Sequence, residues 1–299
     1  MSLEISGDQL EALRDRVRVL AEMARAEDLG RRGDITSPLM EGPRKAGAFR
    51  LVARQPGVLA GRPLGAQIVD VFDSAVAVHW DDSVADGCPF EPGQVLAWLE
   101  GPKGSILSLE RVFLNFMQRL CGVATATRLY VDAVAGTGAR IFDTRKTIPA
   151  WRLLDKYAVR CGGGCNHRMG LHDAVLIKDN HLAGVAPADL AGAVFAMLNR
   201  AASLEPAPAL VEVEADTLEQ VEQLCKVVGI DVLLLDNFSL DDLRRAVAMR
   251  DKLGLKGKVA LEASGGVTLE AVRGIAETGV DRISVGAITH SAPAVDLAL

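Results

Sequence analysis

Residues 210–252 read LVEVEADTLEQVEQLCKVVGIDVLLLDNFSLDDLRRAVAMRDK and contain two successive strand–helix patterns. The short runs 210–213 and 232–235 predict buried strands, and the amphipathic segments 217–228 and 240–252 that follow them predict helices. A strand followed by a covering helix is the repeating unit of a parallel α/β sheet. This stretch therefore assigns the chain to the α/β class.

The same pattern recurs on both sides of this stretch, with further strands predicted at 139–142, 174–177, 259–261 and 282–285. Nearly every predicted strand ends in charged residues or a glycine-rich turn: Asp143-Thr144-Arg145-Lys146, Lys178-Asp179-Asn180, Glu212 with Glu214, Asp236-Asn237, Ser264-Gly265-Gly266 and Gly286-Ala287. A β/α barrel carries its site at the carboxyl ends of several strands, whereas an open Rossmann sheet concentrates it at one switch point. The six polar ends therefore favour a barrel.

The first part of the chain has a different pattern. Residues 8–27 predict an amphipathic helix, and short β-like runs separated by Pro-Gly and Asp-Gly turns predict an antiparallel sheet. These runs are 48–53, 58–60, 68–72, 75–79 and 95–100. Ser108 is predicted to cap a long apolar helix, 109–134, that connects the two parts of the chain.

Composition narrows the class of protein further. The 299 residues are 49% hydrophobic, and their net charge of −6 argues against a nucleic-acid partner. We expect no membrane span, because no run approaches about 18 apolar residues, and no export signal at the N-terminus. Five cysteines without framework spacing favour a reducing, cytoplasmic setting.

Positive charge is concentrated between Arg145 and Lys178, a segment that contains seven Lys and Arg residues but only two Asp. Because Arg145, Lys146, Arg168 and Lys178 are predicted near strand ends, they predict a site for a polyanionic small molecule. The alternative is a solvated basic face. Lys178 could instead form a Schiff base, but its charged neighbours favour ion pairing with an anion.

The segment 160–181, RCGGGCNHRMGLHDAVLIKDNH, carries the most specific signal. Its three consecutive glycines allow the backbone to approach a ligand, and Asn166-His167-Arg168 then offer planar donors for carboxylate or phosphate. A structural zinc site is weighed as the alternative, although C-x3-C lacks a second matching pair. Its candidate ligands are Cys161, Cys165, His167 and His172.

Carboxylates and glycine turns complete the predicted site. Glu212 and Glu214 share one face of their strand and Asp236 ends the next, so they could hold Mg²⁺, or pair internally with the basic cluster. The last two strands are followed by turns that could bind phosphate through backbone N–H groups, although each could be only a tight turn. These turns are Ser264-Gly265-Gly266 and Val285-Gly286-Ala287.

The chain resembles the quinolinate phosphoribosyltransferase family, whose motifs it matches in order from about residue 27 to 291. The matching stretches are EDLGRRGDITS, LERVFLNFMQRLCGVAT, DTRKT, KYAVRCGGGCNHRMGLHDAVLIKDNH, VEVE, LLLDN, EASGGV and SVGAITHS. The resemblance implies an N-terminal α/β sandwich domain over 1–118 and a C-terminal open α/β (TIM-like) barrel over 119–287, and the tail 288–299 could pack back on the first domain. It also implies a homodimer, in which each barrel mouth faces the partner's N-terminal domain, and leaves a higher oligomer open.

The reaction that the resemblance implies joins quinolinate to phosphoribosyl pyrophosphate in de novo NAD biosynthesis. Its products are nicotinate mononucleotide, pyrophosphate and CO₂. Mg²⁺ is expected with phosphoribosyl pyrophosphate, and no organic cofactor is expected, because a cationic ring nitrogen can itself support loss of the adjacent carboxylate.

The resemblance also implies roles for individual residues. Substrate binding is expected from Thr144 and from Arg145, His167, Arg168 and Lys178, which would hold the carboxylates of quinolinate, with Arg111 contributed across the dimer. Lys146 would lie between the two substrates and act in catalysis with Glu212 and Asp236, which would bind the ribose hydroxyls and Mg²⁺. The two glycine turns, 264–266 and 285–287, would hold the 5′-phosphate.

Departures from the family pattern are modest. Ile148 replaces a second Thr after DTRKT, and Ala150-Trp151 replaces a Gly-Leu pair. A related molybdenum-associated group of phosphoribosyltransferases with another substrate is one alternative. That group has Ala-Gly-Gly and Pro-His-Arg where this chain has Cys-Gly-Gly-Gly and Asn-His-Arg. A Schiff-base lyase and a non-catalytic anion-binding module are the remaining alternatives.

Overall fold

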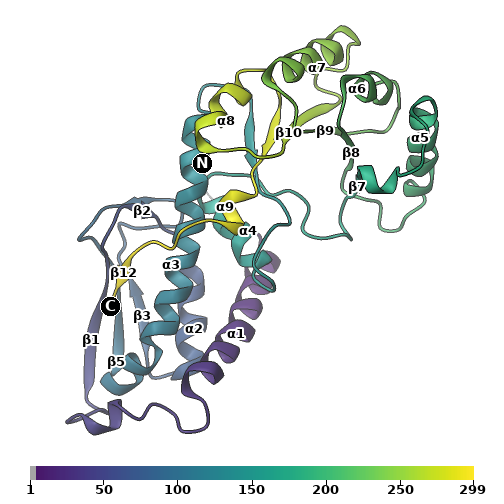
Figure 1. The fold of residues 1–299 in the computed structure, drawn as a ribbon. Coiled ribbons are helices and arrows are strands. Elements are labelled where there is room, and N and C mark those ends of the chain that lie inside the picture. Colours follow the sequence, from purple (N-terminus) through teal and green to yellow (C-terminus); the bar gives the residue numbers. More distant parts are fainter. Residues whose placement is uncertain (1–4) are drawn as a thin grey trace. The chain divides into compact units, whose positions relative to one another are not determined.

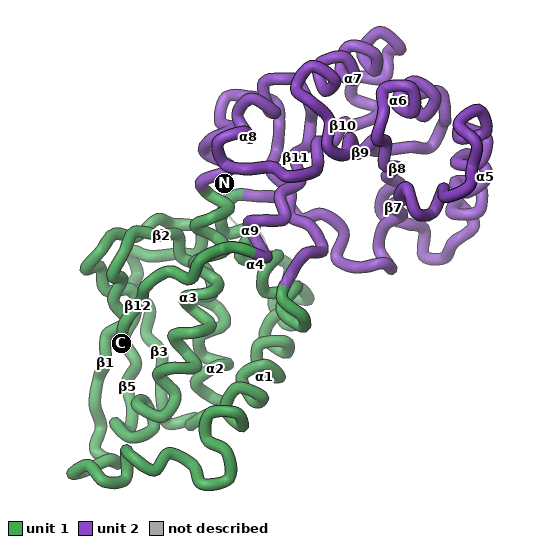
Figure 2. Tube along the Cα trace, viewed as in Figure 1, with its two compact units in different colours: residues 1–128, 148–163, 291–299 green, residues 129–147, 164–290 purple. Residues whose placement is uncertain are grey.

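The computed structural model describes residues 5–299, which form two compact units (Figures 1 and 2). Unit 1 contains the described residues up to Arg128, together with Ile148–Gly163 and Ser291–Leu299. Unit 2 contains Leu129–Thr147 and Gly164–His290. These compact units do not follow the predicted domain ranges, 1–118 and 119–287, which stay a prediction.

Unit 1 is built on a four-stranded antiparallel sheet, as the turn pattern predicts. The strand order is β12-β1-β5-β3, from β1 (Ala46–Ala53), β3 (Ala77–Trp80), β5 (Val95–Pro102) and β12 (Leu297–Ala298). Ala53 is paired with Leu297, so the C-terminal segment adds an edge strand to a sheet formed early in the chain. A separate ribbon joins β2 (Gly57–Val58) to β4 (Pro89–Phe90).

The helices of unit 1 correct two predictions. The run 68–72, predicted as a strand, belongs to helix α2 (Gly65–Phe72), where Gly65, Ile68 and Val69 are buried at a spacing of three and four residues, which is helical. So short an apolar run fits either period, and tertiary packing decides between them. The other helices with unit 1 residues are α1 (Gly7–Leu29), α3 (Lys103–Ala133) and α4 (Arg152–Cys161).

Ser108 does not cap the long helix, because α3 begins five residues earlier, at Lys103. The Ser108 hydroxyl lies within the helix and donates to the Gly104 carbonyl (2.9 Å) and to Asp34 (2.6 Å). A serine inside a helix can satisfy its hydroxyl on the preceding turn in this way, so its sequence signal resembles that of a cap.

Unit 2 is a six-stranded, all-parallel sheet. Its strands are β6 (Arg140–Phe142), β7 (Val175–Ile177), β8 (Val211–Ala215), β9 (Val232–Asp236), β10 (Ala260–Ser264) and β11 (Arg282–Ser284). In the order β6-β11-β10-β9-β8-β7, the last of these strands along the chain, β11, pairs with the first, β6. The two edges of the sheet are β6 and β7, which do not pair with each other. This cyclic order with one open seam confirms the predicted open α/β barrel, and all six strands lie within a few residues of their predicted positions.

Helices follow the strands of unit 2 and cover the sheet (Figure 1). They are α5 (Leu190–Ala201), α6 (Leu218–Leu224), α7 (Leu240–Lys252), α8 (Leu269–Ala276) and the short α9 (Ala287–His290). Thr217, Ser239 and Thr268 cap three of them through their side-chain oxygens. Buried strand residues such as Val213, Leu233 and Leu261 form the core of this unit. Short 3₁₀ turns complete the chain at Ser37–Leu39, Arg62–Leu64, Asp179–His181 and Pro187–Asp189.

The segment that departs from the family pattern lies in unit 1. Ala150 has a φ of 65°, a left-handed conformation that glycine adopts more easily than alanine. Next to it, the indole of Trp151 stacks on Phe116, with ring centroids 4.9 Å apart. Trp151 therefore anchors the segment that follows the loop carrying Arg145 and Lys146.

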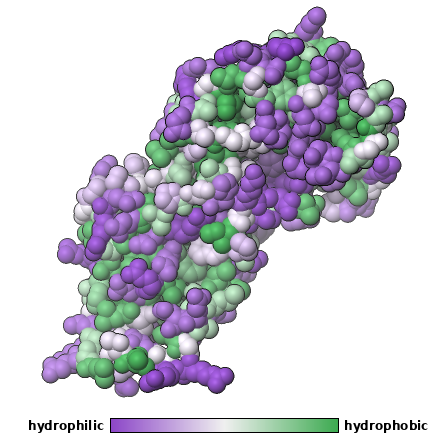
Figure 3. Space-filling view, viewed as in Figure 1, coloured by the Kyte–Doolittle hydropathy of each residue, from purple (hydrophilic) through white to green (hydrophobic). Residues whose placement is uncertain are grey.

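The surface mixes hydrophilic side chains with smaller hydrophobic areas on both units (Figure 3). Within the described residues, no helix is long and apolar enough to span a membrane. All five cysteines are free, and in the part of the chain that the structure describes no cluster of metal-ligating side chains contains a cysteine. The zinc alternative therefore has no support in the structure.

Candidate active site

The loop that follows β6 carries the first two predicted cations. Thr144 accepts a hydrogen bond from the backbone N–H of Lys146 (3.0 Å), which closes a tight turn after the strand. The carbonyl of Lys146 in turn accepts from the Thr289 hydroxyl (2.8 Å) on α9. The side chains of Arg145 and Lys146 are exposed, as ligand-binding cations must be.

A second loop carries His167 and Arg168. Cys165 forms a parallel bridge with Phe142 at the end of β6, so this loop runs beside the first one. The half-buried Arg168 donates to the Ala174 carbonyl (3.3 Å). Burial lowers the pKa of Arg168, and the nearby positive charge of Arg145 lowers it further. The positive charge of Arg145 therefore acts on Arg168, which is carried by the neighbouring loop.

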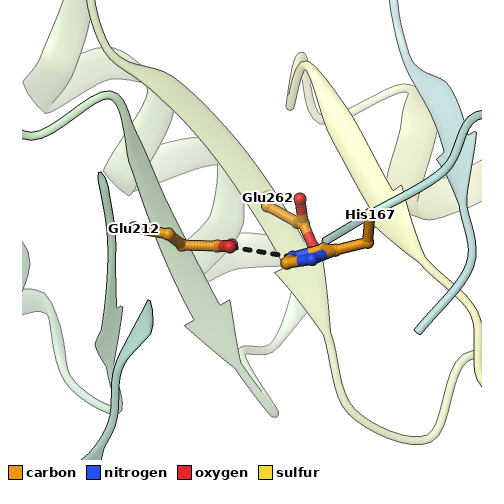
Figure 4. A group of neighbouring side chains, drawn as sticks. All are labelled: His167, Glu212 and Glu262. Atoms are coloured by element: carbon orange, nitrogen blue, oxygen red, sulfur yellow. Dashed lines mark ion pairs between the residues drawn. The ribbon is translucent and has the colours of Figure 1, made fainter. Parts of the chain in front are cut away.

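His167 lies in a buried network of charged groups between strands (Figure 4). Its Nε2 is 2.8 Å from Glu212 on β8 and 3.5 Å from Glu262 on β10, and both carboxylates are fully buried. Arg282 on β11 pairs with Glu262 at 2.5 Å, and its guanidinium lies 3.9 Å from the ring centroid of Phe142. The pairing compensates part of the cost of burying two carboxylates.

Protons in this network can be placed from its hydrogen bonds. Burial lowers the pKa of His167 and the carboxylates of Glu212 and Glu262 raise it, with a net increase. However, Nδ1 accepts the backbone N–H of Arg168 (2.7 Å), which requires an unprotonated nitrogen, so we assign a neutral ring with its proton on Nε2. Burial, and then the charge of Glu212, raise the pKa of Glu262 to about 7. Glu262 is therefore the carboxylate of this network that is protonated below about pH 7.

Three other carboxylates converge at the carboxyl ends of β8 and β9. Oxygens of Glu214, Asp216 and Asp236 lie within 4.8 Å of one another. Lys178, at the end of β7, pairs with Glu214, and Asn237 donates to Asp236 (2.6 Å). A pocket of about 300 Å³ lies alongside, lined in part by Asp179, Glu214 and Asp216.

Only one of these two clusters suits Mg²⁺. Glu214, Asp216 and Asp236 offer carboxylate oxygens alone at strand ends, and although Glu214 is buried, Asp216 is exposed and Asp236 half-buried. The His167 cluster is buried and includes a ring nitrogen, Nε2, which carries a proton and so cannot bind a cation, and Mg²⁺ prefers oxygen ligands. The chemistry of the donors therefore fits a magnesium ion at the three carboxylates and not at His167.

The first glycine turn is shaped by close backbone contact. A Cβ atom on Gly265, whose φ is 95°, would lie 2.1 Å from Oδ1 of Asn237. Asn237 itself has a φ of 57° and donates its N–H to the Ser264 carbonyl (2.9 Å). The turns after β9 and β10 thus interlock, and only glycine fits at this position.

The second turn brings the last strand next to the first loop. A Cβ atom on Gly286 would approach Cδ of Lys146 and Cδ2 of His290 at 3.1 Å. Gly286 therefore lets the backbone after β11 lie against Lys146. Val285 is buried in this turn, and Ala287 begins α9.

The structure groups most, but not all, of the predicted site residues. Apart from Glu212, which is the second residue of β8, the predicted groups of unit 2 lie at or after the carboxyl-terminal parts of the strands: Thr144, Arg145, Lys146, His167, Arg168, Lys178, Asp236, Ser264, Gly265, Gly266, Val285, Gly286 and Ala287. Arg111 is an exposed residue of α3 within unit 1, and its role stays a prediction. The predicted functions of the other residues likewise stay predictions.

Glu212 lies in a different cluster from Asp236, with which it was predicted to act. Strand register explains the difference, because Glu212 is paired with Val232 whereas Glu214 is paired with Leu234, two residues before Asp236. Glu214 was already a sequence candidate for Mg²⁺, but the resemblance assigned the role to Glu212, and Asp216 is the carboxylate that the sequence-based site omitted. The signal that could have found Asp216 is position, since the last carboxylates of a strand lie nearest its carboxyl end.

Comparisons with known proteins agree with this fold. The descriptions "Quinolinate phosphoribosyl transferase, N-terminal domain" and "Quinolinate phosphoribosyl transferase, C-terminal domain" match residues 34–121 and 123–299. The nicotinate-nucleotide pyrophosphorylase (carboxylating) of Mycobacterium leprae is 40% identical over 296 residues, which are 99% of each chain. A probable nicotinate-nucleotide pyrophosphorylase of Bacillus subtilis is 37% identical and covers 91% of this chain and 89% of its own.

Solved structures give the same result. The nicotinate-nucleotide pyrophosphorylase from Francisella tularensis has a TM-score of 0.84 and 37% identity, with 95% of both chains covered. Together with the open parallel barrel and its charged strand ends, these matches define a phosphoribosyltransferase, a pentosyl-transferring enzyme. More narrowly, the chain belongs to the quinolinate phosphoribosyltransferase family.

Proposed function

We propose that this enzyme transfers the phosphoribosyl group of phosphoribosyl pyrophosphate to quinolinate and releases CO₂, forming nicotinate mononucleotide and pyrophosphate for de novo NAD biosynthesis. One observation carries the proposal: the cations Arg145, Arg168 and Lys178 share the strand ends of one sheet with the carboxylates Glu214 and Asp236. Cations suit a dicarboxylate substrate, and carboxylates suit a sugar that becomes positively charged during transfer.

The cations recognise quinolinate. The guanidinium of Arg168 is partly desolvated beside that of Arg145, and a dianion placed between them would relieve their repulsion. Lys178 is held by Glu214, so it links the quinolinate subsite to the carboxylates of the sugar subsite. Nicotinate, with one carboxylate, would make fewer charged contacts in this site than quinolinate.

The carboxylates act on the ribose. As the bond from C1 to pyrophosphate breaks, its electron pair leaves with pyrophosphate and positive charge develops on the ribose ring. Glu214 and Asp236 stabilise that charge, and the ring nitrogen of quinolinate forms the new bond to C1. The nitrogen is then cationic, so the adjacent carboxylate leaves as CO₂, its electron pair stays on the ring carbon, and that carbon takes up a proton.

Mg²⁺ belongs to the proposal as the companion of phosphoribosyl pyrophosphate. Glu214, Asp216 and Asp236 would hold it, and it would neutralise the leaving pyrophosphate. The turns 264–266 and 285–287 would bind the 5′-phosphate through backbone N–H groups, with Lys146 next to Gly286. Glu212 is reassigned to the network of His167.

We further propose a homodimer in which Arg111 of one subunit completes the quinolinate site of the other. Support comes from the exposure of this cation on α3 and from the family to which the chain belongs. The cytoplasmic location predicted from the sequence stays a prediction.

The deciding experiment is one assay with two acceptors. Purified protein with Mg²⁺ and phosphoribosyl pyrophosphate should form nicotinate mononucleotide and CO₂ from quinolinate, and should use nicotinate at least about 100-fold less well, because an unpaired cation costs several kcal/mol. Equal use of nicotinate would contradict the dicarboxylate site. Binding of phosphoribosyl pyrophosphate without turnover would instead support the non-catalytic alternative.

A further inference from the structure

Two loops of unit 2 bring like charges together. Loop 144–147 carries Arg145, and loop 164–168 carries Arg168, whose pKa is lowered in part by the charge of Arg145. The two loops run side by side through the bridge between Phe142 and Cys165, and like charges on neighbouring loops oppose their close approach. Holding them at a fixed distance before a substrate arrives therefore requires an attachment between the loops.

Asp143 provides that attachment. It is fully buried at the end of β6, next to Thr144 in the chain. Its Oδ1 accepts the backbone N–H of His167 (2.8 Å), and its Oδ2 accepts the side-chain amide of Asn166 (2.6 Å). Its own N–H donates to the Cys165 carbonyl (3.1 Å). The residue directly before the first loop thus binds three successive residues of the second.

We propose that Asp143 is a positioning residue for the substrate site, which fixes the distance between Arg145 and Arg168 by tying loop 144–147 to loop 164–168. This inference rests on the proposed function, in which the two arginines bind the two carboxylates of quinolinate. Asp143 touches neither substrate, and its effect reaches quinolinate only through the loops.

The chemistry of the residue suits this task. A carboxylate accepts hydrogen bonds on both oxygens, whereas an amide offers one acceptor oxygen and places a donor opposite Asn166. A negative charge between two cationic loops also lowers their mutual repulsion. The short aspartate side chain keeps both acceptors close to the backbone, so small movements of either loop are resisted.

The test is a kinetic comparison of the full-length enzyme with Asp143→Ala and Asp143→Asn. We expect KM for quinolinate to rise about 10- to 100-fold with Asp143→Ala, as lost charged hydrogen bonds typically cause, and less with Asp143→Asn. KM for phosphoribosyl pyrophosphate should change less than about twofold, and the preference for quinolinate over nicotinate should decrease. A loss caused by poor folding alone would not separate the two substrates.

Asp281→Ala is the matched control. Asp281 also accepts a backbone N–H, that of Leu261 (2.8 Å), and it pairs with the buried Arg250 (2.5 Å), at the amino ends of the strands of the same sheet. We expect Asp281→Ala to lower thermal stability at least as much as Asp143→Ala does, because it leaves a buried charge without this partner. Both KM values should remain those of the wild type.

A rescue variant covers the case in which Asp143→Ala does not fold. The double variant Asp143→Asn/Asn166→Asp returns the negative charge and lets the new amide donate to the new carboxylate. If Asp143→Asn raises KM for quinolinate strongly, we expect the double variant to lower it again at least tenfold. In either case the double variant should restore the preference for quinolinate over nicotinate.

The outcomes separate the inference from the function on which it rests. An unchanged quinolinate KM in the folded Asp143 variants, or equal increases in both KM values, would overturn the positioning role while wild-type turnover of quinolinate still supported the proposed function. Failure of the double variant to restore substrate preference would also overturn it. Wild-type protein that does not use quinolinate would refute the function itself.

Discussion

Glu262 is a single residue whose protonation should be visible in the stability of the whole protein. Its pKa is about 7 in the folded protein against an ordinary value of 4.5, because it is buried beside Glu212. The folded state thus holds a proton that the unfolded chain releases, so stability is highest below about pH 4.5 and falls as the pH rises to 7. Over this window the loss should be roughly 1–3 kcal/mol.

Glu262→Gln tests this dependence. The variant cannot titrate at this position, so its unfolding free energy should fall less between pH 5 and pH 8 than that of the wild type. Urea unfolding at several pH values measures the difference, and Glu270→Gln, at an exposed helix start, serves as the control. Parallel pH profiles for wild type and Glu262→Gln would show that the proton resides elsewhere.

Arg168 should depend on its shape as well as on its charge. Arg168→Lys keeps a positive charge but loses the planar pair of N–H donors that can bind one carboxylate at two points. Quinolinate turnover should fall by about 10- to 100-fold, corresponding to ~1–3 kcal/mol of charged hydrogen bonding. Steady-state kinetics measures this loss, and wild-type quinolinate kinetics in the variant would remove Arg168 from the site.

Ala150 should gain stability from becoming glycine. A φ of 65° destabilises an alanine by roughly 1–2 kcal/mol relative to glycine. Glycine also makes the unfolded chain more flexible, which cancels part of this stabilisation. The expected net stabilisation by Ala150→Gly is about 0.5–1 kcal/mol. Thermal unfolding checks it, with Ala193→Gly inside α5 as a control that should lose about 1 kcal/mol.

At the scale of elements, the strand–helix alternation predicted unit 2 well because β7 to β10 are each followed by a helix of seven residues or more. The run 68–72 was predicted wrongly because five mostly apolar residues satisfy both a strand and a two-turn helix, and only packing in unit 1 distinguishes the two. Serine is a residue type that commonly caps helices, but Ser108 lies inside α3, where its hydroxyl donates to the Gly104 carbonyl. Local patterns therefore predict elements where periodicity is long and fail where it is short.

The sequence predicts which site residues lie on each strand, but not which residues of neighbouring strands meet. The sequence placed carboxylates on β8 and β9, but which of them meet depends on register between strands, and register is not visible along one strand. The resemblance paired Asp236 with Glu212, whereas in the structure Asp236 lies with Glu214, which the sequence had also offered for Mg²⁺, and with Asp216. Asp143 was passed over for a similar reason, since its partners lie on a distant loop.

The register makes a prediction for the ends of β8 and β9. Asp236→Asn should lower kcat by about 10² or more, because it removes a charge that stabilises the developing cation, while KM changes little. Glu214→Gln should have a similar effect. An unchanged kcat, with only a greater need for Mg²⁺, would leave these carboxylates with metal binding alone.

At the scale of the whole molecule, the proposed shared site can be tested by mixing subunits. Arg111→Ala and Lys146→Ala should each be nearly inactive alone. If the two proteins are unfolded and refolded together, random pairing makes about half of the dimers mixed, and each mixed dimer has one intact site if Arg111 serves the partner. Activity should therefore return to roughly one quarter of the wild-type value.

Wild-type protein refolded in parallel controls for recovery. If Arg111 serves its own subunit, every site in every dimer keeps one defect and mixing restores nothing. That result would refute the shared site and leave the reaction assignment unchanged.

The pairing of β12 with β1 bears on how the protein is made. Every strand of unit 2 lies between these two partners along the chain, so a ribosome must finish the barrel's residues before the first sheet can gain its edge strand. During synthesis, β1 waits with one edge unpaired, exposed to other nascent chains. Fusions or truncations near Leu297 should consequently harm the assembly of a sheet whose other strands were translated long before.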